Sequence, residues 1–321
     1  MIQKKVINEL SKVIKDAKTF LIFSHINPEP DTIGSALAFY YYLNSAGKTV
    51  FVHNFDGLPK YMDFMPFASE VSKDIPDNKF DVVLSLDAGS IDMLGDKFPP
   101  KDKKMIVNVD HHRTNTRFGD LNIVDPASSA TAELVYTLFR KMGIKIDTTI
   151  ASLLLTGIIY DTGSFRYRNT TAKTLKIASE LIQNGANITE ISDKLYENQS
   201  LGRLKLLEMV LKTLELSVNG KIASIELTRQ MYHATGTTKD DAEGFIDYPR
   251  SISGVAVAAM FREVDDNKYK ISMRSKNDVD VSAIAQVFGG GGHKNAAGCT
   301  MDGILFDVKN SIFTAIADRL K

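Results

Sequence analysis

The sequence predicts an α/β protein of two domains, and three observations support this prediction. Short apolar runs alternate with helical patterns through the first half of the chain, from TFLIFSH (19–25) to KKMIVNVDHH (103–112). This alternation is typical of a mainly parallel sheet flanked by helices. The pattern is then almost wholly helical from Ser128 to about Leu214. It changes afterwards to strand pairs, the first with Asn219-Gly220 at its turn.

The 321 residues are enough to bury two separate cores. We therefore predict a first domain over residues 1–189, a helical connector over 190–214 and a smaller C-terminal α+β domain over 215–321. Asp31 or Thr32 is expected to cap the helix that follows the first strand, because short polar side chains are favoured at that position.

The composition limits the function classes. The 39 basic and 39 acidic residues balance, so no overall field attracts long duplex nucleic acid or an anionic membrane. The single cysteine, Cys299, excludes an intramolecular disulfide framework, and six histidines without a CxxC motif argue against a structural zinc cluster. The N-terminal 18 residues fit an amphipathic helix and lack the apolar core of a signal peptide. A cytoplasmic protein without a membrane partner is expected.

Acidic and imidazole side chains occur in four groups at the ends of predicted strands or helices. In an open α/β sheet, ligands bind at the carboxyl ends of the strands. The first group follows the first strand, the second ends the run LSLD, the third ends MIVNVD and the fourth ends the apolar helix LLLTGIIYD. The groups consist of His25, Glu29 and Asp31; Asp87; Asp110, His111 and His112; and Asp161.

These groups predict a metal centre. An unpaired buried carboxylate costs several kcal/mol, and few arginines lie near these positions to neutralise four of them. Imidazole combined with several carboxylates suits Mn²⁺, Mg²⁺ or Fe²⁺, and two ions that share Asp87 would use nearly all of the ligands. A single Asp after a strand is more often a helix cap or a loop residue. The coincidence of several motifs favours a metal site, whereas His53 and His233 lack such a context.

The motifs resemble those of the DHH phosphoesterases that carry a DHH-associated C-terminal domain. The resemblance covers essentially the whole chain, and within the family it is strongest to the bacterial nano-RNases that also act as pAp phosphatases. The family pattern His-x-x-x-Asp-x-Asp appears here as the segment from His25 to Asp31, with Glu29 where the family usually has Asp. The resemblance implies that residues 1–189 form the DHH catalytic domain and that residues 215–321 form the substrate-binding domain.

The resemblance also implies the ligands of two divalent ions, Mn²⁺ in the first place, with Mg²⁺ or other ions as alternatives. One ion would be held by His25, Glu29 and Asp87. The other would be held by Asp31, Asp87, His111 and Asp161. Asp110 is implied to orient a ligand imidazole. His112 is implied to face the scissile phosphate, and the catalytic role implied for His112 and Arg274 is to stabilise the charge on the phosphoryl oxygens.

The stretch FGGGGHKNAAG (288–298) is a second candidate, for substrate binding. Glycines let a backbone approach a ligand closely, although a helix-to-strand linker uses glycines too. The family's matching Gly-Gly-Gly-His motif binds substrate, and Arg274 resembles the family arginine that contacts a phosphate. In the first domain, two residues after the Asp-His-His triplet are phosphate candidates, with a solvated loop as the alternative for the arginine. The substrate-binding candidates are Arg113, Asn115, Arg274, Gly290, Gly291, Gly292 and His293.

The resemblance implies a two-metal-dependent phosphodiesterase and phosphatase. It would hydrolyse short RNA or DNA oligonucleotides, such as nano-RNA and pGpG, to mononucleotides, and pAp to AMP, without a covalent enzyme intermediate. A cyclic-dinucleotide phosphodiesterase and an exopolyphosphatase are alternatives within the enzymes. A nucleotide-binding regulatory module is the alternative outside them, because Glu29 could have cost the chain its activity. The oligomeric state stays open, with a homodimer as one expectation.

Overall fold

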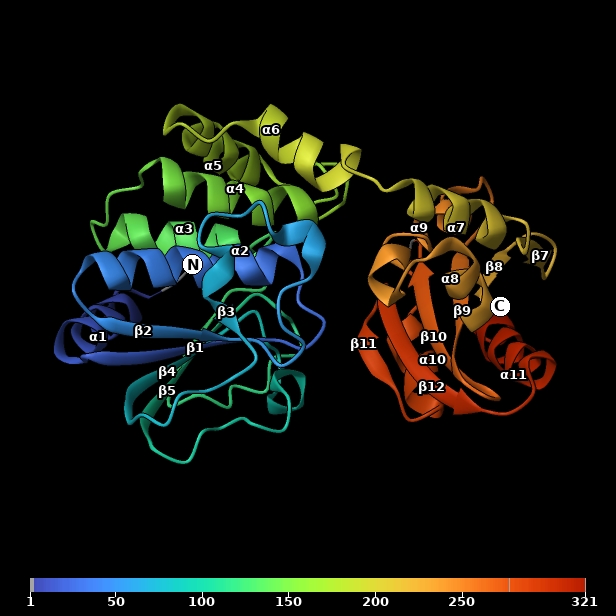
Figure 1. The fold of residues 1–321 in the computed structure, drawn as a ribbon, viewed down its shortest axis with the longest axis horizontal. Coiled ribbons are helices and arrows are strands. Elements are labelled where there is room, and N and C mark those ends of the chain that lie inside the picture. Colours follow the sequence, from blue (N-terminus) through green and yellow to red (C-terminus); the bar gives the residue numbers. More distant parts are fainter. Residues whose placement is uncertain (1–2, 277, 321) are drawn as a thin grey trace. The chain divides into compact units, whose positions relative to one another are not determined.

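The computed structural model describes residues 3–276 and 278–320, apart from the side chain of His293 (Figure 1). The chain divides into two compact units, residues 1–198 and residues 199–321. Each unit contains one six-stranded sheet. The predicted α/β fold with a mainly parallel first sheet and a smaller mixed second domain is therefore confirmed.

In the first unit, all neighbouring strands are parallel and lie in the order β3-β2-β1-β4-β5-β6. The chain moves outward from β1 to β3 and then returns to place β4 on the other side of β1. The point between β1 and β4 is where ligands bind in sheets of this topology. The strands are β1 (Thr19–Ser24), β2 (Thr49–His53), β3 (Val71–Ser72), β4 (Phe80–Leu86), β5 (Lys103–Asp110) and β6 (Leu121–Val124).

The helices of the first unit share one core with one face of its sheet. Alternate residues of a strand point to opposite faces, so Phe20 and Ile22 of β1 pack in the helical core. Leu21 and Phe23 pack in a separate core with Phe98, from the segment after β4. The helices are α1 (Lys4–Asp16), α2 (Pro30–Ser45), α3 (Thr131–Lys141), α4 (Thr148–Asp161), α5 (Ala172–Gln183) and α6 (Ile188–Ser192), followed by a π-helix (Asp193–Glu197). Figure 1 shows α2, α3, α4 and α5 stacked above the strands.

In the second unit, the sheet is mixed and has the order β11-β12-β10-β9-β8-β7. Both predicted hairpins are present as the antiparallel pairs β7/β8 and β9/β10, whereas β8 and β9 are parallel. The strands are β7 (Glu215–Ser217), β8 (Ile222–Leu227), β9 (Val257–Asp265), β10 (Lys268–Ser275), β11 (Gly291–His293) and β12 (Ala296–Asp302). Its helices are α7 (Leu201–Leu211), α8 (Arg229–Thr235), α9 (Asp247–Ser251), α10 (Val281–Val287) and α11 (Leu305–Ala317).

The segment predicted as a connector, 190–214, is divided between the units. The end of α6 and the π-helix belong to the first unit, and α7 belongs to the second. Leu206 and Val210 of α7 pack in one core with Ile225 of β8. The predicted domain limits and a connecting role for 190–214 stay predictions. Among the described residues, no helix has the length and apolar character needed to cross a membrane.

The predicted cap of the first βα helix was wrong. Helix α2 begins at Pro30, whose fixed φ suits a first helical position. Glu29 is therefore the N-cap, and its side chain makes no capping hydrogen bond in the described structure. Asp31 lies within the first turn of α2 and points to another helix, as described below.

A loss of stability in mild acid is expected from His53. Its imidazole is fully buried, and within the described part of the chain neither ring nitrogen has a hydrogen-bond partner in the structure. Burial and the charge of Lys97 lower the pKa of His53 to about 4, against a small opposing effect of the Ser72 backbone and Asp74. The unfolded chain takes up this proton near pH 6.5. Stability is therefore full above pH 6.5 and falls as the pH falls toward 4, by up to about 3 kcal/mol.

Urea unfolding of the wild type and of His53→Leu from pH 7.5 down to 4.5 tests this expectation. The free energy of unfolding of the variant should depend less steeply on pH, by close to one proton. Equal slopes for the two proteins in this window would contradict it.

Candidate metal centre

The predicted ligands meet at one edge of the first sheet. His25 follows β1, Asp87 follows β4, and the Asp110-His111-His112 triplet lies at the end of β5. Strands β1, β4 and β5 are parallel neighbours, so their carboxyl ends lie side by side. Asp31 comes from the first turn of α2 and Asp161 from the last residue of α4. The edge lies at the reversal of strand order, where this topology places ligands.

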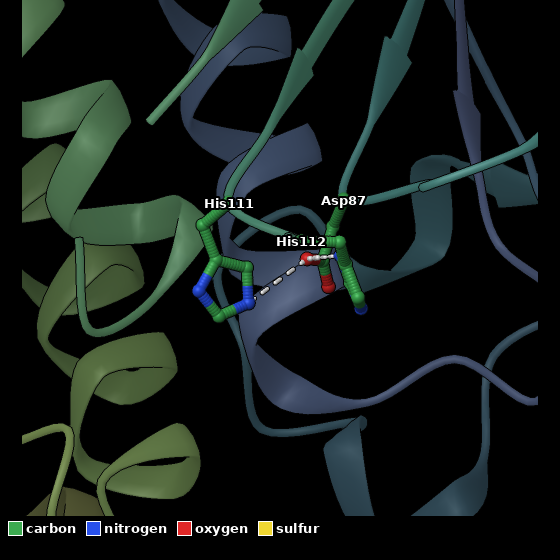
Figure 2. Close-up of side chains that lie close together, drawn as sticks. All are labelled: Asp87, His111 and His112. Atoms are coloured by element: carbon green, nitrogen blue, oxygen red, sulfur yellow. Dashed lines mark ion pairs between the residues drawn. The ribbon is translucent and has the colours of Figure 1, made fainter. Parts of the chain in front are cut away.

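Figure 2 shows a carboxylate oxygen of Asp87 between the rings of His111 and His112. Its Oδ1 is 3.7 Å from His111 Nε2 and 3.7 Å from His112 Nδ1. Its Oδ2 is 3.4 Å from His25 Nε2. The backbone of Asp87 has a φ of +60°, an uncommon conformation that residues at functional sites adopt more often than others.

Two groups of side chains could each hold a metal ion. One consists of Asp87, His111 and His112, and the other of Asp31, His111 and Asp161. His111 Nε2 lies 3.6 Å from Asp161 Oδ2. The Nδ1 atom of His111 donates a hydrogen bond to the Ser128 carbonyl at 3.2 Å, and a donating Nδ1 leaves Nε2 as the ligating atom of an imidazole.

The charges of the cluster favour a cation. Burial, together with the charges of Asp87 and Asp161, raises the pKa of Asp31 well above its ordinary range. Burial and the charge of Asp87 likewise raise the pKa of Asp161, against the opposing charge of His111. Buried carboxylates that repel one another in this way are stabilised by a positive charge between them.

The pKa values of His111 and His25 are raised as well, and for an imidazole a raised pKa favours the charged form. Burial alone would lower the pKa of His111, but the charges of Asp161, Asp87 and Asp31 raise it to about 9. The pKa of His25 also rises to about 9, because its hydrogen bond with Asp87 and the charges of Asp87 and Glu29 outweigh burial. Oxygen and imidazole donors without sulfur suit Mn²⁺, Mg²⁺ or Fe²⁺, so the residues present fit a divalent metal centre.

Comparison with known proteins identifies the family. Residues 19–158 match the DHH family, N-terminal domain, and residues 220–321 match the DHHA1 domain. A relative from Thermus thermophilus is 32% identical over 89% of this chain and 85% of its own length. The chain belongs to the DHH family. The predicted resemblance is therefore confirmed, and the protein has acidic and histidine side chains that are positioned to bind a metal.

Several relatives of this DHH protein have the same name. The Thermus thermophilus protein is named bifunctional oligoribonuclease and PAP phosphatase NrnA. So is a Bacillus subtilis protein that is 31% identical over 91% of this chain and 92% of its own length. The solved structure of an exopolyphosphatase-related protein from Bacteroides fragilis has a TM-score of 0.92 at 29% identity, over 99% of this chain and 97% of its own.

Within the DHH triplet, Asp110 contacts the second histidine. Its Oδ1 accepts a hydrogen bond from His112 Nδ1 at 2.5 Å, and its Oδ2 accepts one from Asn115 Nδ2 at 2.6 Å. The same amide of Asn115 is 2.8 Å from Asn108 Oδ1. Asn115 thus supports Asp110 in this structure, and its contact with a phosphate stays a prediction. Arg113 is exposed, and its role also stays a prediction.

Glu29 is the residue that departs from the family pattern. It lies near His25, because its charge contributes to the raised pKa of that imidazole. In the described ranges it belongs to neither group of potential metal ligands. Ligation by Glu29 therefore stays a prediction.

Sequence reasoning missed residues that support the predicted ligands. The hydroxyls of Thr32 and Thr131 donate to the two oxygens of Asp87 at 2.6 and 2.8 Å. Gly157 lets α4 approach α2, because a Cβ there would lie 2.7 Å from Asp31 Oδ1. The glycine inside the apolar helix LLLTGIIYD was a visible signal for close packing, whereas nothing in the sequence separated these threonines from others.

In the DHHA1 domain, Arg274 and His293 occupy one row of the sheet. Arg274 on β10 pairs with Ala296 on β12, and Ala296 pairs with the backbone of His293 on β11. The side chain of His293 lies outside the described part of the chain. Their contacts with substrate stay predictions.

The fold of the DHHA1 domain requires some glycines of its glycine run and leaves room for a side chain at another. A Cβ at Gly290 would lie 2.1 Å from the Gly298 carbonyl oxygen, and Gly292 has a φ of +141°. These two glycines are required by the fold. A Cβ at Gly291 would have no heavy atom of the described structure within 4 Å, beyond its chain neighbours. Packing therefore does not explain Gly291.

Proposed function

We propose that this protein is a two-metal-dependent phosphoesterase that hydrolyses short oligonucleotides, including nano-RNA and pGpG, to mononucleotides, and pAp to AMP. One observation carries the proposal. Acidic and histidine side chains from four separate segments meet at one sheet edge, in a chain whose relatives over most of its length are named oligoribonuclease and PAP phosphatase. A cytoplasmic location fits these substrates.

Two Mn²⁺ ions are the proposed cofactors. His25, Glu29 and Asp87 would hold one ion, and Asp31, Asp87, His111 and Asp161 would hold the other. Bound there, the ions supply Lewis-acid stabilisation of the negative charge on the phosphoryl oxygens.

His112 and Asp110 have the proposed catalytic roles in the first unit. Asp110 fixes the His112 ring through Nδ1, so Nε2 is the atom that acts on the phosphate. An imidazole held in this way is directed at a phosphate oxygen before the reaction begins, without reorganisation during it.

We propose that a small set of polar groups contacts the substrate, because the charge-balanced sequence has no long basic stretch that could follow a polymeric nucleic acid. Arg274 binds a phosphate as a bidentate donor. The backbone at Gly290, Gly291 and Gly292, with His293, lies against the nucleotide. Arg113 and Asn115 contribute from the first unit.

A direct test compares initial rates with Mn²⁺ on RNAs of increasing length, on pGpG, on pAp and on polyphosphate. The highest rates are expected with dinucleotides and pAp, and rates should fall as the RNA becomes longer. Turnover of none of these nucleotides would reject the proposal and favour a regulatory nucleotide-binding module. Exopolyphosphatase is the second candidate, because the Bacteroides fragilis protein named exopolyphosphatase-related has nearly the same fold. A higher rate on polyphosphate would favour it.

A matched pair of glycine variants tests the DHHA1 contacts. Gly291→Ala should keep the Tm of the wild type, because the added Cβ meets no described atom. It should raise KM for a dinucleotide by about tenfold, corresponding to roughly 1.4 kcal/mol of lost binding. Gly290→Ala should lower the Tm, because its Cβ would overlap the Gly298 carbonyl oxygen. An unchanged KM in Gly291→Ala would remove this residue from the substrate site.

A further inference from the structure

The segment from Ser128 to Ala132, which leads into α3, contacts several predicted ligands at once. The Ser128 carbonyl accepts a hydrogen bond from His111 Nδ1. The backbone amides of Thr131 and Ala132 donate to the two oxygens of Asp31 at 2.7 and 2.8 Å. The Thr131 hydroxyl donates to Asp87 Oδ1 at 2.8 Å. One short segment therefore orients side chains from α2, β4 and β5.

The N-terminus of α3 holds the carboxylate of Asp31 in place. The N-cap is Ala130, which has no polar side chain. The first amides of α3 are satisfied instead by Asp31, one hundred residues earlier in the chain. Amides at a helix N-terminus favour a negatively charged partner. The carboxylate is thus stabilised and fixed in direction by the same contact.

Thr131 is the residue of this segment that joins two carboxylates. Its backbone amide contacts Asp31 and its hydroxyl contacts Asp87, and its side chain is fully buried. The other oxygen of Asp87 accepts a hydrogen bond from Thr32 at 2.6 Å. A carboxylate oxygen has two lone pairs, so these bonds leave lone pairs for a metal while they limit rotation of the carboxylate.

We infer that Thr131 is a positioning residue of the metal centre, which holds Asp87 through its hydroxyl in the orientation relative to Asp31 that metal binding needs. The inference rests on the metal centre of the proposed function and concerns how that centre is held. The alternative is that Thr131 only completes the start of α3. In that case its hydroxyl would affect stability and leave metal affinity unchanged.

Three variants separate these roles. Thr131→Val keeps the β-branched shape and the backbone amide to Asp31, and it removes only the hydroxyl to Asp87. Thr131→Ser keeps the hydroxyl. Thr137→Val is the matched control on the same helix, because the Thr137 hydroxyl bonds the Glu133 carbonyl in α3 itself.

The primary measurement is Mn²⁺ affinity of the full chain by titration calorimetry, with the electron paramagnetic resonance spectrum of bound Mn²⁺ as a second readout. Thr131→Val should bind Mn²⁺ about 10- to 100-fold more weakly, the usual effect of losing a group that supports a ligand. Thr131→Ser should restore binding, and Thr137→Val should match the wild type. At saturating Mn²⁺, kcat for a dinucleotide should fall in Thr131→Val, while KM stays unchanged.

Wild-type Mn²⁺ affinity in Thr131→Val would overturn the inference, as would equally weak binding in Thr131→Val and Thr131→Ser. If Thr131→Val proves unstable, Thr131→Ala removes the same hydroxyl without demands on space and gives the same comparison. Affinity also separates this inference from the proposed function. A wild type that binds Mn²⁺ but turns over no nucleotide would reject the function, and the affinities of the variants would still decide the role of Thr131.

Discussion

Asp87→Asn is expected to reduce hydrolysis of a dinucleotide with Mn²⁺ by ~10³-fold or more. Asp87 lies within 3.7 Å of all three imidazoles, those of His25, His111 and His112. An amide in its place loses the negative charge that those groups share with a cation. Metal centres supply several kcal/mol of charge stabilisation, and each ~1.4 kcal/mol corresponds to a tenfold change in rate. Initial rates with saturating Mn²⁺ measure the effect.

Asp102→Asn is the matched control for this prediction. Asp102 is an exposed carboxylate just before β5, at the opposite edge of the same sheet. It should keep wild-type rates. Circular dichroism establishes that both variants are folded. Rates within a few-fold of the wild type in folded Asp87→Asn would remove Asp87 from the centre.

Asp161→Asn is expected to abolish activity and to raise the Tm in EDTA. The pKa of Asp161 is raised in the folded protein by burial and by the charge of Asp87. When folding raises the pKa of a carboxyl group, that group destabilises the folded protein at every pH above the pKa it has in the unfolded chain. A neutral amide removes this cost at pH 7. With saturating Mn²⁺ the order should reverse, because the wild type gains more stability from binding the ion.

Thermal unfolding in EDTA and in Mn²⁺ checks this reversal. Asp31→Asn provides the contrast, because Asp31 also accepts hydrogen bonds from the first amides of α3. An amide nitrogen against those donors costs a hydrogen bond, so Asp31→Asn should be less stable in EDTA than Asp161→Asn. A Tm of Asp161→Asn below that of the wild type in EDTA would show that the carboxylates do not repel one another as described.

The sequence was sufficient to predict the fold class. It was also sufficient to predict that the segments with the candidate metal ligands lie together. The reason is geometric, since the carboxyl ends of parallel strands lie together whatever the exact strand order. A residue directly after a strand, such as His25 or Asp87, could therefore be placed at the edge from the sequence alone. Asp161 was marked by the length of the apolar helix before it.

The supporting contacts could not be predicted, because they depend on how the helices pack against one another. Asp31 looked like a cap for its own helix, and only the packing of α2 beside α3 makes it the partner of Thr131. The glycine run shows the same limit. Sequence reasoning treated Gly290, Gly291 and Gly292 alike, whereas the structure separates Gly290 and Gly292, which the fold requires, from Gly291.

The bond between Asp31 and Thr131 spans one hundred residues, and this separation has a consequence for biogenesis. During synthesis, no ribosome-bound fragment that ends before α4 can assemble the cluster, since Asp161 closes it. We therefore expect metal binding only after α4 has been synthesised and has packed against α2. Manganese should slow unfolding of the finished protein, and it should leave the refolding rate nearly unchanged.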